Sequence, residues 1–217
     1  MNKKLVIYDI IFYAVIPFFI WTYGKEPLGD YTAILLSTVP GFIYTIYRFI
    51  KEKELNIAGL FIITSLFIST AVNLLSTSAD SMLWNQVYLG FGTCIIYLIS
   101  MIIRKPMALY FMVDIAYLYG DPREFSKRLF NSDGLFMWFQ IFNLLFIVRG
   151  IFLSTLKAFL VKTYGAAGYG KMLIYMNISS LVFSGLILLG YFFINKKVKQ
   201  YLKEQEEVKE PAMEGEI

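Results

Sequence analysis

Residues 135–156 read LFMWFQIFNLLFIVRGIFLSTL, and this stretch decides the class of fold. An α-helix needs about 20 mainly apolar residues to cross the hydrocarbon core of a bilayer. The stretch is long enough to do so, and only one charged residue, Arg149, interrupts it. It therefore predicts a membrane-spanning helix rather than a helix buried in a soluble core.

The composition extends this interpretation to the whole chain. Of its 217 residues, 58% are hydrophobic and 17% are charged, and the mean hydropathy is +0.60. A soluble domain is nearer half apolar and a quarter charged. The sequence thus predicts an all-α, polytopic membrane protein with a bundle over residues 1–195 and a charged tail over 196–217. Its six expected transmembrane helices are 5–23, 31–50, 56–75, 85–103, 135–156 and 172–195.

The distribution of basic residues predicts the orientation. Cytoplasmic segments of membrane proteins carry an excess of Lys and Arg. With six spans and a cytoplasmic N-terminus, 15 of the 20 basic residues fall inside and four fall outside, Arg149 being the twentieth. The sequence therefore predicts that both termini are cytoplasmic. The last helix is expected to run on to about residue 208, before Pro211.

The longest connector, 104–134, is predicted to lie on the cytoplasmic side. Its apolar part, 107–118, is too short to span, so it either lies flat at the interface or re-enters the membrane. Asp114 faces headgroups in the first case and is a candidate ion or proton site in the second. A short basic helix should follow. Five basic residues are candidates for contacts with anionic headgroups or a partner: Arg104, Lys105, Arg123, Lys127 and Arg128.

Three stretches, in this order, resemble the intracellular septation protein A family of small bacterial inner-membrane proteins. They are IYTIYRFIKEKELN (43–56), IIRKPMALYF (102–111) and LFNSDGLFMWFQIF (129–142). The chain differs from the family in an additional first helix and a longer 104–134 connector, as a sister group of six-helix proteins would. The resemblance covers about residues 30–110 and 128–195. It implies a bacterial inner-membrane setting and a part in envelope maintenance, and it brings no catalytic residues.

The residue types present argue against an enzyme. The chain has no histidine, which removes Ser-His catalysis, HExxH zinc sites and His-ligated haem. No Gly-rich phosphate loop is present, and the single cysteine, Cys94, lies in an apolar run. No clustered acid–base pair can be assembled. We therefore expect no enzymatic activity, no cofactor, no metal site and no nucleic-acid partner.

Polar residues inside the spans have two interpretations. Gln140, Asn143, Gly150 and Ser154 fall on one stripe of their helix, because successive residues are 100° apart. Small and weakly polar residues let membrane helices approach and hydrogen-bond, which predicts a closely packed seam. The alternative is a polar cavity for a small ligand or a lipid headgroup.

Arg149 is the most unusual of these residues, because an ionisable side chain inside a span is a functional-site hypothesis by default. The side chain either snorkels to the outer interface or binds a partner inside. Pro40 frees the carbonyl of Leu36, and Ser37 and Thr38 lie beside it. We expect Arg149 to bind this carbonyl, with Asp30 or Asp80 nearer the outer surface. A cation at this depth is also suited to a phosphate or a carboxylate.

Two functions follow as hypotheses. The first is a non-enzymatic integral membrane protein of the bacterial envelope, acting on lipids, on another membrane protein or on a second copy of itself. The second is a small carrier or substrate-binding membrane subunit for an anionic solute or a lipid headgroup. In the second case the polar cavity would be built from Arg149, Gln140, Asn143, Ser37, Thr38 and Asp114.

Overall fold

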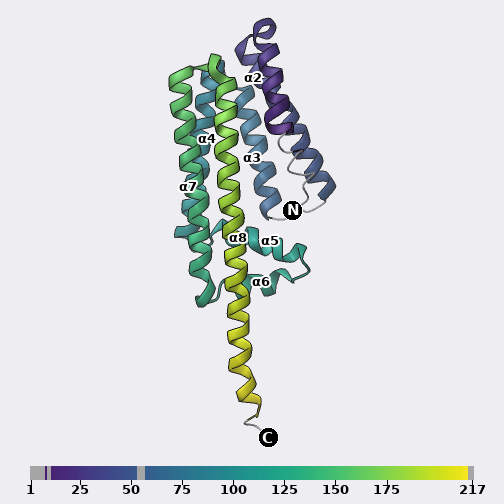
Figure 1. Cartoon of the computed structure of the whole chain (residues 1–217), viewed down its shortest axis with the longest axis vertical. Coiled ribbons are helices and arrows are strands. Elements are labelled where there is room, and N and C mark those ends of the chain that lie inside the picture. The colour runs from purple at the N-terminus through teal and green to yellow at the C-terminus, as the bar shows by residue number, and fades with distance from the viewer. Residues whose placement is uncertain (1–7, 9–10, 53–56, 215–217) are drawn as a thin grey trace. The chain divides into compact units, whose positions relative to one another are not determined.

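The structure is a computed structural model of the chain, and it describes residues 8, 11–52 and 57–214 (Figure 1). Every regular element in these residues is helical, which confirms the predicted all-α class for this part of the chain. The elements in chain order are η1 (Ile11–Val15), α2 (Ile16–Glu52), α3 (Ile57–Leu74), α4 (Ala79–Ile102), α5 (Met107–Leu118), α6 (Arg123–Phe130), α7 (Asp133–Tyr164), η2 (Ala166–Gly168) and α8 (Tyr169–Glu214).

Element α2 is a hairpin of two helical arms rather than one straight helix. The chain turns at Gly29, whose φ of 75° and ψ of 159° are conformations that only glycine adopts readily. The arms lie against each other, because the hydroxyls of Tyr13 and Thr45 are 2.6 Å apart. The arms correspond to the predicted segments 5–23 and 31–50, apart from the first residues, which lie outside the described part.

The prolines of this hairpin are accommodated in different ways. The π-helical turn η1 ends at Val15, two residues before Pro17, whose ring would otherwise collide with the carbonyl of Tyr13 four residues earlier. At Pro40, where a break in the ladder is predicted, α2 continues as helix. Gly41 follows it, and a Cβ there would lie 2.9 Å from Cδ1 of Tyr13. Gly41 therefore allows the two arms to meet.

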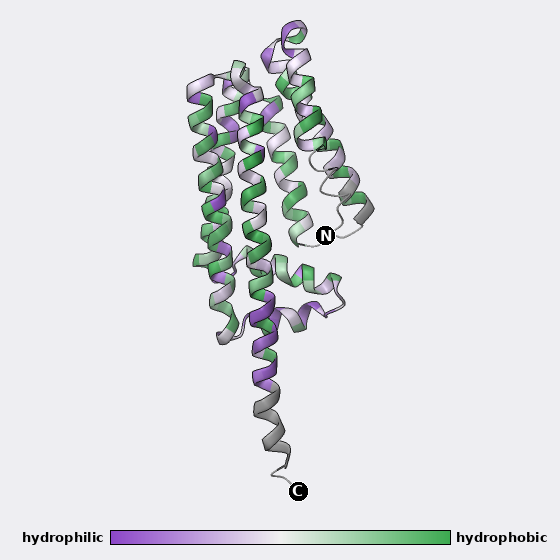
Figure 2. Cartoon of the chain, viewed as in Figure 1, coloured by the Kyte–Doolittle hydropathy of each residue, from purple (hydrophilic) through white to green (hydrophobic). Residues whose placement is uncertain are grey.

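Four helical segments among the described residues are long and apolar enough to cross a membrane: α3, α4, α7 and Ala166–Gln205. The most apolar windows of α3 and of Ala166–Gln205 have a mean hydropathy of 2.0 and only 6% of their residues buried. Apolar residues run along these helices, whereas hydrophilic ones gather on α6 and the C-terminal part of α8 (Figure 2). Apolar surface on this scale is suited to lipid.

The other two predicted spans, 5–23 and 31–50, correspond to the arms of α2, and neither arm is among these four segments of the described residues. The length and apolar composition of four helical segments thus indicate a membrane protein. The six-span arrangement stays a prediction.

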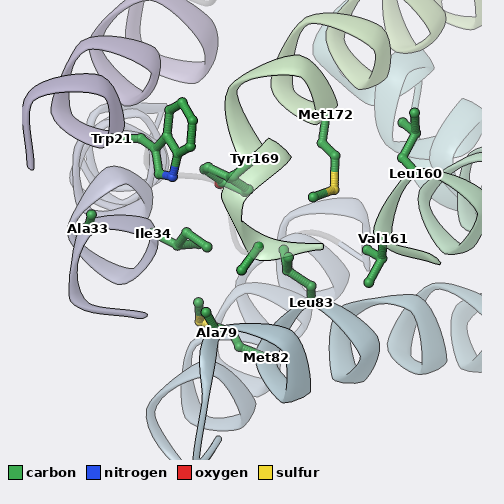
Figure 3. Packing of buried hydrophobic residues seen from close by; sticks show 11 residues of the cluster. Trp21, Ala33, Ile34, Ala79, Met82, Leu83, Leu160, Val161, Tyr169 and Met172 are labelled. Carbon is green, nitrogen blue, oxygen red and sulfur yellow. The ribbon is translucent and has the colours of Figure 1, made fainter. Parts of the chain in front are cut away.

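The chain forms two compact units, and α4, α7 and α8 contribute residues to both. Unit 1 comprises Met1–Cys94 and Gly150–Val182. Its core brings together side chains from α2, α4, α7, η2 and α8 (Figure 3). The buried residues are Trp21, Ala33, Ile34, Ala79, Met82, Leu83, Leu160, Val161, Ala166, Tyr169 and Met172.

Unit 2 comprises Ile95–Arg149 and Phe183–Ile217. Helices α5 and α6 pack through one face on α7 and α8, and the rings of Phe130 and Phe139 lie 4.7 Å apart. The bounds of α5 match the predicted segment 107–118, and α6 matches the predicted short basic helix. The buried residues are Ala108, Leu109, Met112, Val113, Phe130, Leu135, Phe139, Phe142, Ile194 and Val198.

Two predicted helix ends are wrong. Helix α7 continues to Tyr164 instead of ending at residue 156, because AFLV follows Lys157 and restores the apolar pattern. Helix α8 continues to Glu214 instead of residue 208, and Pro211 lies within it. A proline near a helix end removes few backbone hydrogen bonds. Helix α8 also crosses residue 195 without a break, so the charged tail begins as a continuation of the last helix.

Candidate functional site

A chain of polar side chains links three helices of unit 1. The ammonium of Lys157, on α7, donates to Oε1 of Gln86 on α4. Gln86 in turn donates from Nε2 to Oδ1 of Asn73 on α3, at 2.8 Å. Asn73 is buried, and Lys157 and Gln86 are half-buried. These hydrogen bonds thus place a cation against the amide of Gln86, which is itself held by Asn73, between apolar helices.

Further hydrogen bonds fix the surroundings of this chain. Asn85 donates from Nδ2 to Oγ of Ser76 at 3.0 Å, and the hydroxyl of Tyr31 donates to the backbone carbonyl of Asn73 at 3.2 Å. Oδ1 of Asp80 accepts the backbone N–H of Ala166 at 2.9 Å. These bonds hold the loop before α4 and the connection between α7 and α8.

The charge of Lys157 is not neutralised by a nearby acid. Among the residues that the structure describes, no carboxylate oxygen lies within 4.0 Å of its Nζ atom. An ammonium has three N–H donors, and the described hydrogen bond uses one of them. Two of the three N–H donors of Lys157 are therefore not used by the described hydrogen bond to Gln86.

The small residues of the predicted stripe form a packed seam within unit 1. A Cβ on Gly90 would lie 2.2 Å from Oγ of Ser154, and one on Gly150 would lie 2.4 Å from Sγ of Cys94. Gly90 and Cys94 on α4, like Gly150 and Ser154 on α7, are two small residues four positions apart. This is the pattern that brings membrane helices close together. For Gly150 and Ser154 the structure supports the seam rather than the cavity.

Ser37 and Thr38 bond mainly within their own helix. The hydroxyl of Ser37 donates to the carbonyl of Ile34 at 2.6 Å and lies 3.3 Å from the hydroxyl of Tyr169. The hydroxyl of Thr38 donates to the carbonyl of Leu35 at 2.8 Å. Both residues belong to unit 1 and Arg149 to unit 2, so the predicted pairing of Arg149 with this region stays a prediction.

In unit 2, Asn143 connects the end of α4 to the start of α5. This side chain is fully buried. It donates from Nδ2 to the carbonyl of Tyr97 at 3.1 Å, and its Oδ1 accepts the backbone N–H of Ala108 at 3.0 Å. Because helix ends leave backbone groups without partners, an amide that both donates and accepts is well suited to this place. Asn143 thus has a structural role.

Gln140 lies one turn earlier and has a related role. Its Nε2 donates to the carbonyl of Met101 at 3.2 Å. Its Oε1 is buried and has no hydrogen-bond partner within the described part of the chain. The structure places Gln140 and Asn143 together in unit 2, at the α4–α5 connection.

Asp114 is buried on α5, and its Oδ1 lies 3.8 Å from Nε of Arg123 on α6. The guanidinium of Arg123 also lies 4.2 Å from the ring centroid of Tyr117. Arg123 therefore serves first to hold α6 against α5. The other predicted headgroup contacts, Arg104, Lys105, Lys127 and Arg128, are exposed.

The sequence prediction gives no site role to two lysines that the structure places in polar or aromatic contacts. It puts Lys157 in a loop, although the apolar residues after it signal that the helix continues. It puts Lys197 in the tail, whereas Nζ of this residue lies 5.1 Å from the ring centroid of Trp138. The four-residue spacing of Phe193 and Lys197 on one face of α8 is the available signal for that contact.

No grouping of three or more His, Cys, Asp or Glu side chains suited to a metal ion occurs among the described residues. Comparison with known proteins gives no match to a family model, to a curated protein or to a solved structure.

Proposed function

We propose that this protein is a non-enzymatic component of the bacterial inner membrane that acts by binding anionic lipid in the maintenance of the cell envelope. The resemblance of three sequence stretches to the septation protein A family supports this cellular setting. In this proposal the chain crosses the membrane six times, with both termini in the cytoplasm. Another membrane protein or a second copy of the chain is a further partner on the same face.

The observation that carries the proposal is the basic surface of α6 and of the α4–α5 connection. On α6, Ser126 and Phe130 are buried in the interior of unit 2, whereas Lys127 and Arg128 are exposed. Lys105 is exposed at the end of α4. A basic residue near an anionic membrane surface contributes about 1 kcal/mol. Because Lys105, Lys127 and Arg128 are all exposed, their contributions together favour binding of this surface to anionic lipid.

Native mass spectrometry of the purified protein in mixed phosphatidylglycerol and phosphatidylcholine tests the proposal. We expect preferential retention of phosphatidylglycerol, reduced about tenfold or more by the triple change Lys105→Gln, Lys127→Gln and Arg128→Gln. Arg123 is left intact because it pairs with Asp114. The matched control changes three lysines of unit 1, Lys25, Lys162 and Lys171, to Gln. Equal retention of the two lipids would overturn the proposal.

The six-span orientation has its own test. Single cysteines are introduced at four exposed positions in a Cys94→Ala background and treated in whole cells with a membrane-impermeant maleimide. Positions Leu28, Thr77 and Ala167 should label from outside, whereas Asp121 should label only after lysis. Labelling of Asp121 in intact cells would contradict a cytoplasmic connector.

A second candidate function, a carrier for a small anion, is favoured by the geometry around Lys157. Inorganic phosphate and succinate are suitable probes, because both present the oxygen acceptors that an ammonium binds. Each should raise the melting temperature of the protein, and Lys157→Met should abolish the increase. The control is Lys162→Met, an exposed lysine on the same helix. An increase that survives in Lys157→Met would exclude this site.

A further inference from the structure

An apolar groove runs between α7 and α8 in unit 2. Its volume is about 370 Å³, within the range of small-molecule sites. Every lining residue is apolar: Trp138, Ile141, Phe142, Leu144, Leu145, Val148, Gly190, Phe193 and Ile194. The groove therefore has the chemistry of a site for hydrocarbon.

Gly190 on α8 lies directly against the ring of Phe142, which lines the groove. A Cβ on Gly190 would lie 2.6 Å from Cε2 of Phe142, closer than real side chains approach. At one end, the rings of Trp138 and Phe193 meet edge to face with centroids 5.2 Å apart. Leu144 and Val148 are about half exposed along the side. The groove is thus shaped by fixed rings and open to its surroundings.

A cation lies at the aromatic end of the groove. Nζ of Lys197 is 5.1 Å from the ring centroid of Trp138 and 5.9 Å from that of Phe193. A cation–π contact leaves the N–H donors of the ammonium able to bind an acceptor. Lys196 and Lys199 are exposed next to it on α8. Positive charge therefore collects where the apolar lining ends.

We propose that this groove binds one acyl chain of an anionic phospholipid, whose phosphate lies on Lys197. This inference rests on the proposed function, and it adds a defined site distinct from the surface of α6. Tryptophan and lysine together at the end of an apolar groove match the boundary between acyl chain and headgroup.

A second copy of the chain is a less suitable occupant of the groove. Two copies with the same orientation in one membrane pair through a shared surface about an axis along the membrane normal. Their Lys196, Lys197 and Lys199 side chains would then meet at the same depth, and like charges repel. The charge of the groove end is complementary to a phosphate instead.

Trp138 provides a local probe for this proposal. The chain has three tryptophans, so Trp21→Phe with Trp84→Phe leaves Trp138 as the only one. The protein is reconstituted in vesicles in which either phosphatidylglycerol or phosphatidylcholine carries brominated acyl chains, at equal mole fractions. We expect at least twofold stronger quenching of Trp138 by the brominated phosphatidylglycerol. Equal quenching by the two lipids would overturn the proposal.

Substitutions test the two ends of the site separately. Lys197→Gln should make the quenching of Trp138 by brominated phosphatidylglycerol equal to that by brominated phosphatidylcholine, without abolishing quenching by either lipid. Val148→Phe, which fills the groove, should weaken quenching by both lipids. The matched control is Ile151→Phe on the same helix, about as exposed as Val148 and outside the lining. A preference that persists in Lys197→Gln would contradict the assigned phosphate contact.

Two further measurements keep the result decisive. Because Trp21 lies in the core of unit 1, the quenching is also taken as the difference between the native chain and Trp138→Phe. If phosphatidylglycerol retention depends on Lys105, Lys127 and Arg128 but Trp138 does not discriminate between lipids, the groove site alone is wrong. The converse result supports the groove and contradicts the proposed role of the α6 surface. A dimer in native mass spectrometry that Val148→Phe dissociates would assign the groove to a second copy.

Discussion

Asn143 in unit 2 and Gln86 in unit 1 are both amides between membrane helices, yet they have different partners. Asn143 is fully buried and binds two backbone groups, the carbonyl of Tyr97 in α4 and the N–H of Ala108 at the start of α5. Gln86 binds the charged side chain of Lys157 and the amide of Asn73. Backbone partners are fixed by the fold, whereas a lysine can exchange one partner for another. The comparison therefore separates an amide that is bonded to the backbone from one whose partner is a charged side chain.

The largest effect is expected from Asn143→Ala. This change removes the hydrogen bonds of Asn143 to Ala108 and Tyr97. The carbonyl of Tyr97 still accepts the hydroxyl of Ser100, whereas the buried N–H of Ala108 loses the partner described for it. A buried group left unsatisfied costs about 1–3 kcal/mol, and the cavity left by the side chain adds to this loss, so the melting temperature in detergent should fall strongly. The matched control is Asn177→Ala, because the hydrogen bond of Asn177 within the described residues goes to Leu173 in its own helix. Equal losses for the two variants would contradict the structural role of Asn143.

A smaller loss is expected from Gly90→Ala, which tests the seam between α4 and α7. The added methyl group would meet Oγ of Ser154, and overpacking costs about 1–3 kcal/mol. Gly92→Ala on the same helix has open space and should change the melting temperature little. Adding Ser154→Gly should restore part of the stability lost in Gly90→Ala. If Gly90→Ala lowers the melting temperature no more than Gly92→Ala does, the seam between α4 and α7 is not closely packed and this interpretation is wrong.

Asp114→Asn should have a modest effect, of about 1 kcal/mol or less. The partner Arg123 is exposed to 43%, so solvent screens the ion pair. The change should loosen α6 from α5 more than it lowers global stability. Limited proteolysis at the Gly120–Pro122 connection is the appropriate measurement. We expect faster cleavage there in Asp114→Asn, and unchanged cleavage in Asp133→Asn, an exposed acid at the start of α7.

The smallest effect is expected from Lys157→Met in the absence of added anions. Replacing a membrane charge by an apolar side chain of similar length removes a desolvation cost together with one hydrogen bond. The free energy of unfolding should therefore stay within about 0.5 kcal/mol of the native value, or rise, and the melting temperature should change little. A large loss of stability would show that Lys157 belongs with Asn143 as a structural residue.

The sequence predicts the helical class, the α5 and α6 helices and the packed character of the Gly150 and Ser154 stripe, because these depend on local periodicity and residue size. It does not predict the partners of Asn143 or Lys157. Those partners lie on other helices, and the choice among them depends on how α4 and α7 rotate against each other. The predicted end of α7 is too early because a lysine after an apolar run resembles the start of a loop.

The candidate cavity shows the same limit. The prediction groups its residues by depth in the membrane, which hydropathy gives, and not by neighbourhood, which requires tertiary contacts. The structure assigns Ser37 and Thr38 to unit 1 and Asn143, Gln140, Asp114 and Arg149 to unit 2. Arg149 is conspicuous in the sequence because it interrupts an apolar stretch. Lys157 is not conspicuous there, and only the structure shows that its ammonium binds the neutral amide of Gln86.

Unit 1 is built from two stretches of chain that are separated by residues 95–149. On the ribosome, Asn73 and Gln86 therefore reach the membrane well before Lys157 has been synthesised. Until α7 is made, Gln86 has its partner Asn73 but not Lys157. The side of α4 that carries Gly90 and Cys94 then also lacks the helix that covers it. A nascent chain that stops before residue 150 therefore lacks the second stretch of unit 1, to which α7 and α8 both contribute.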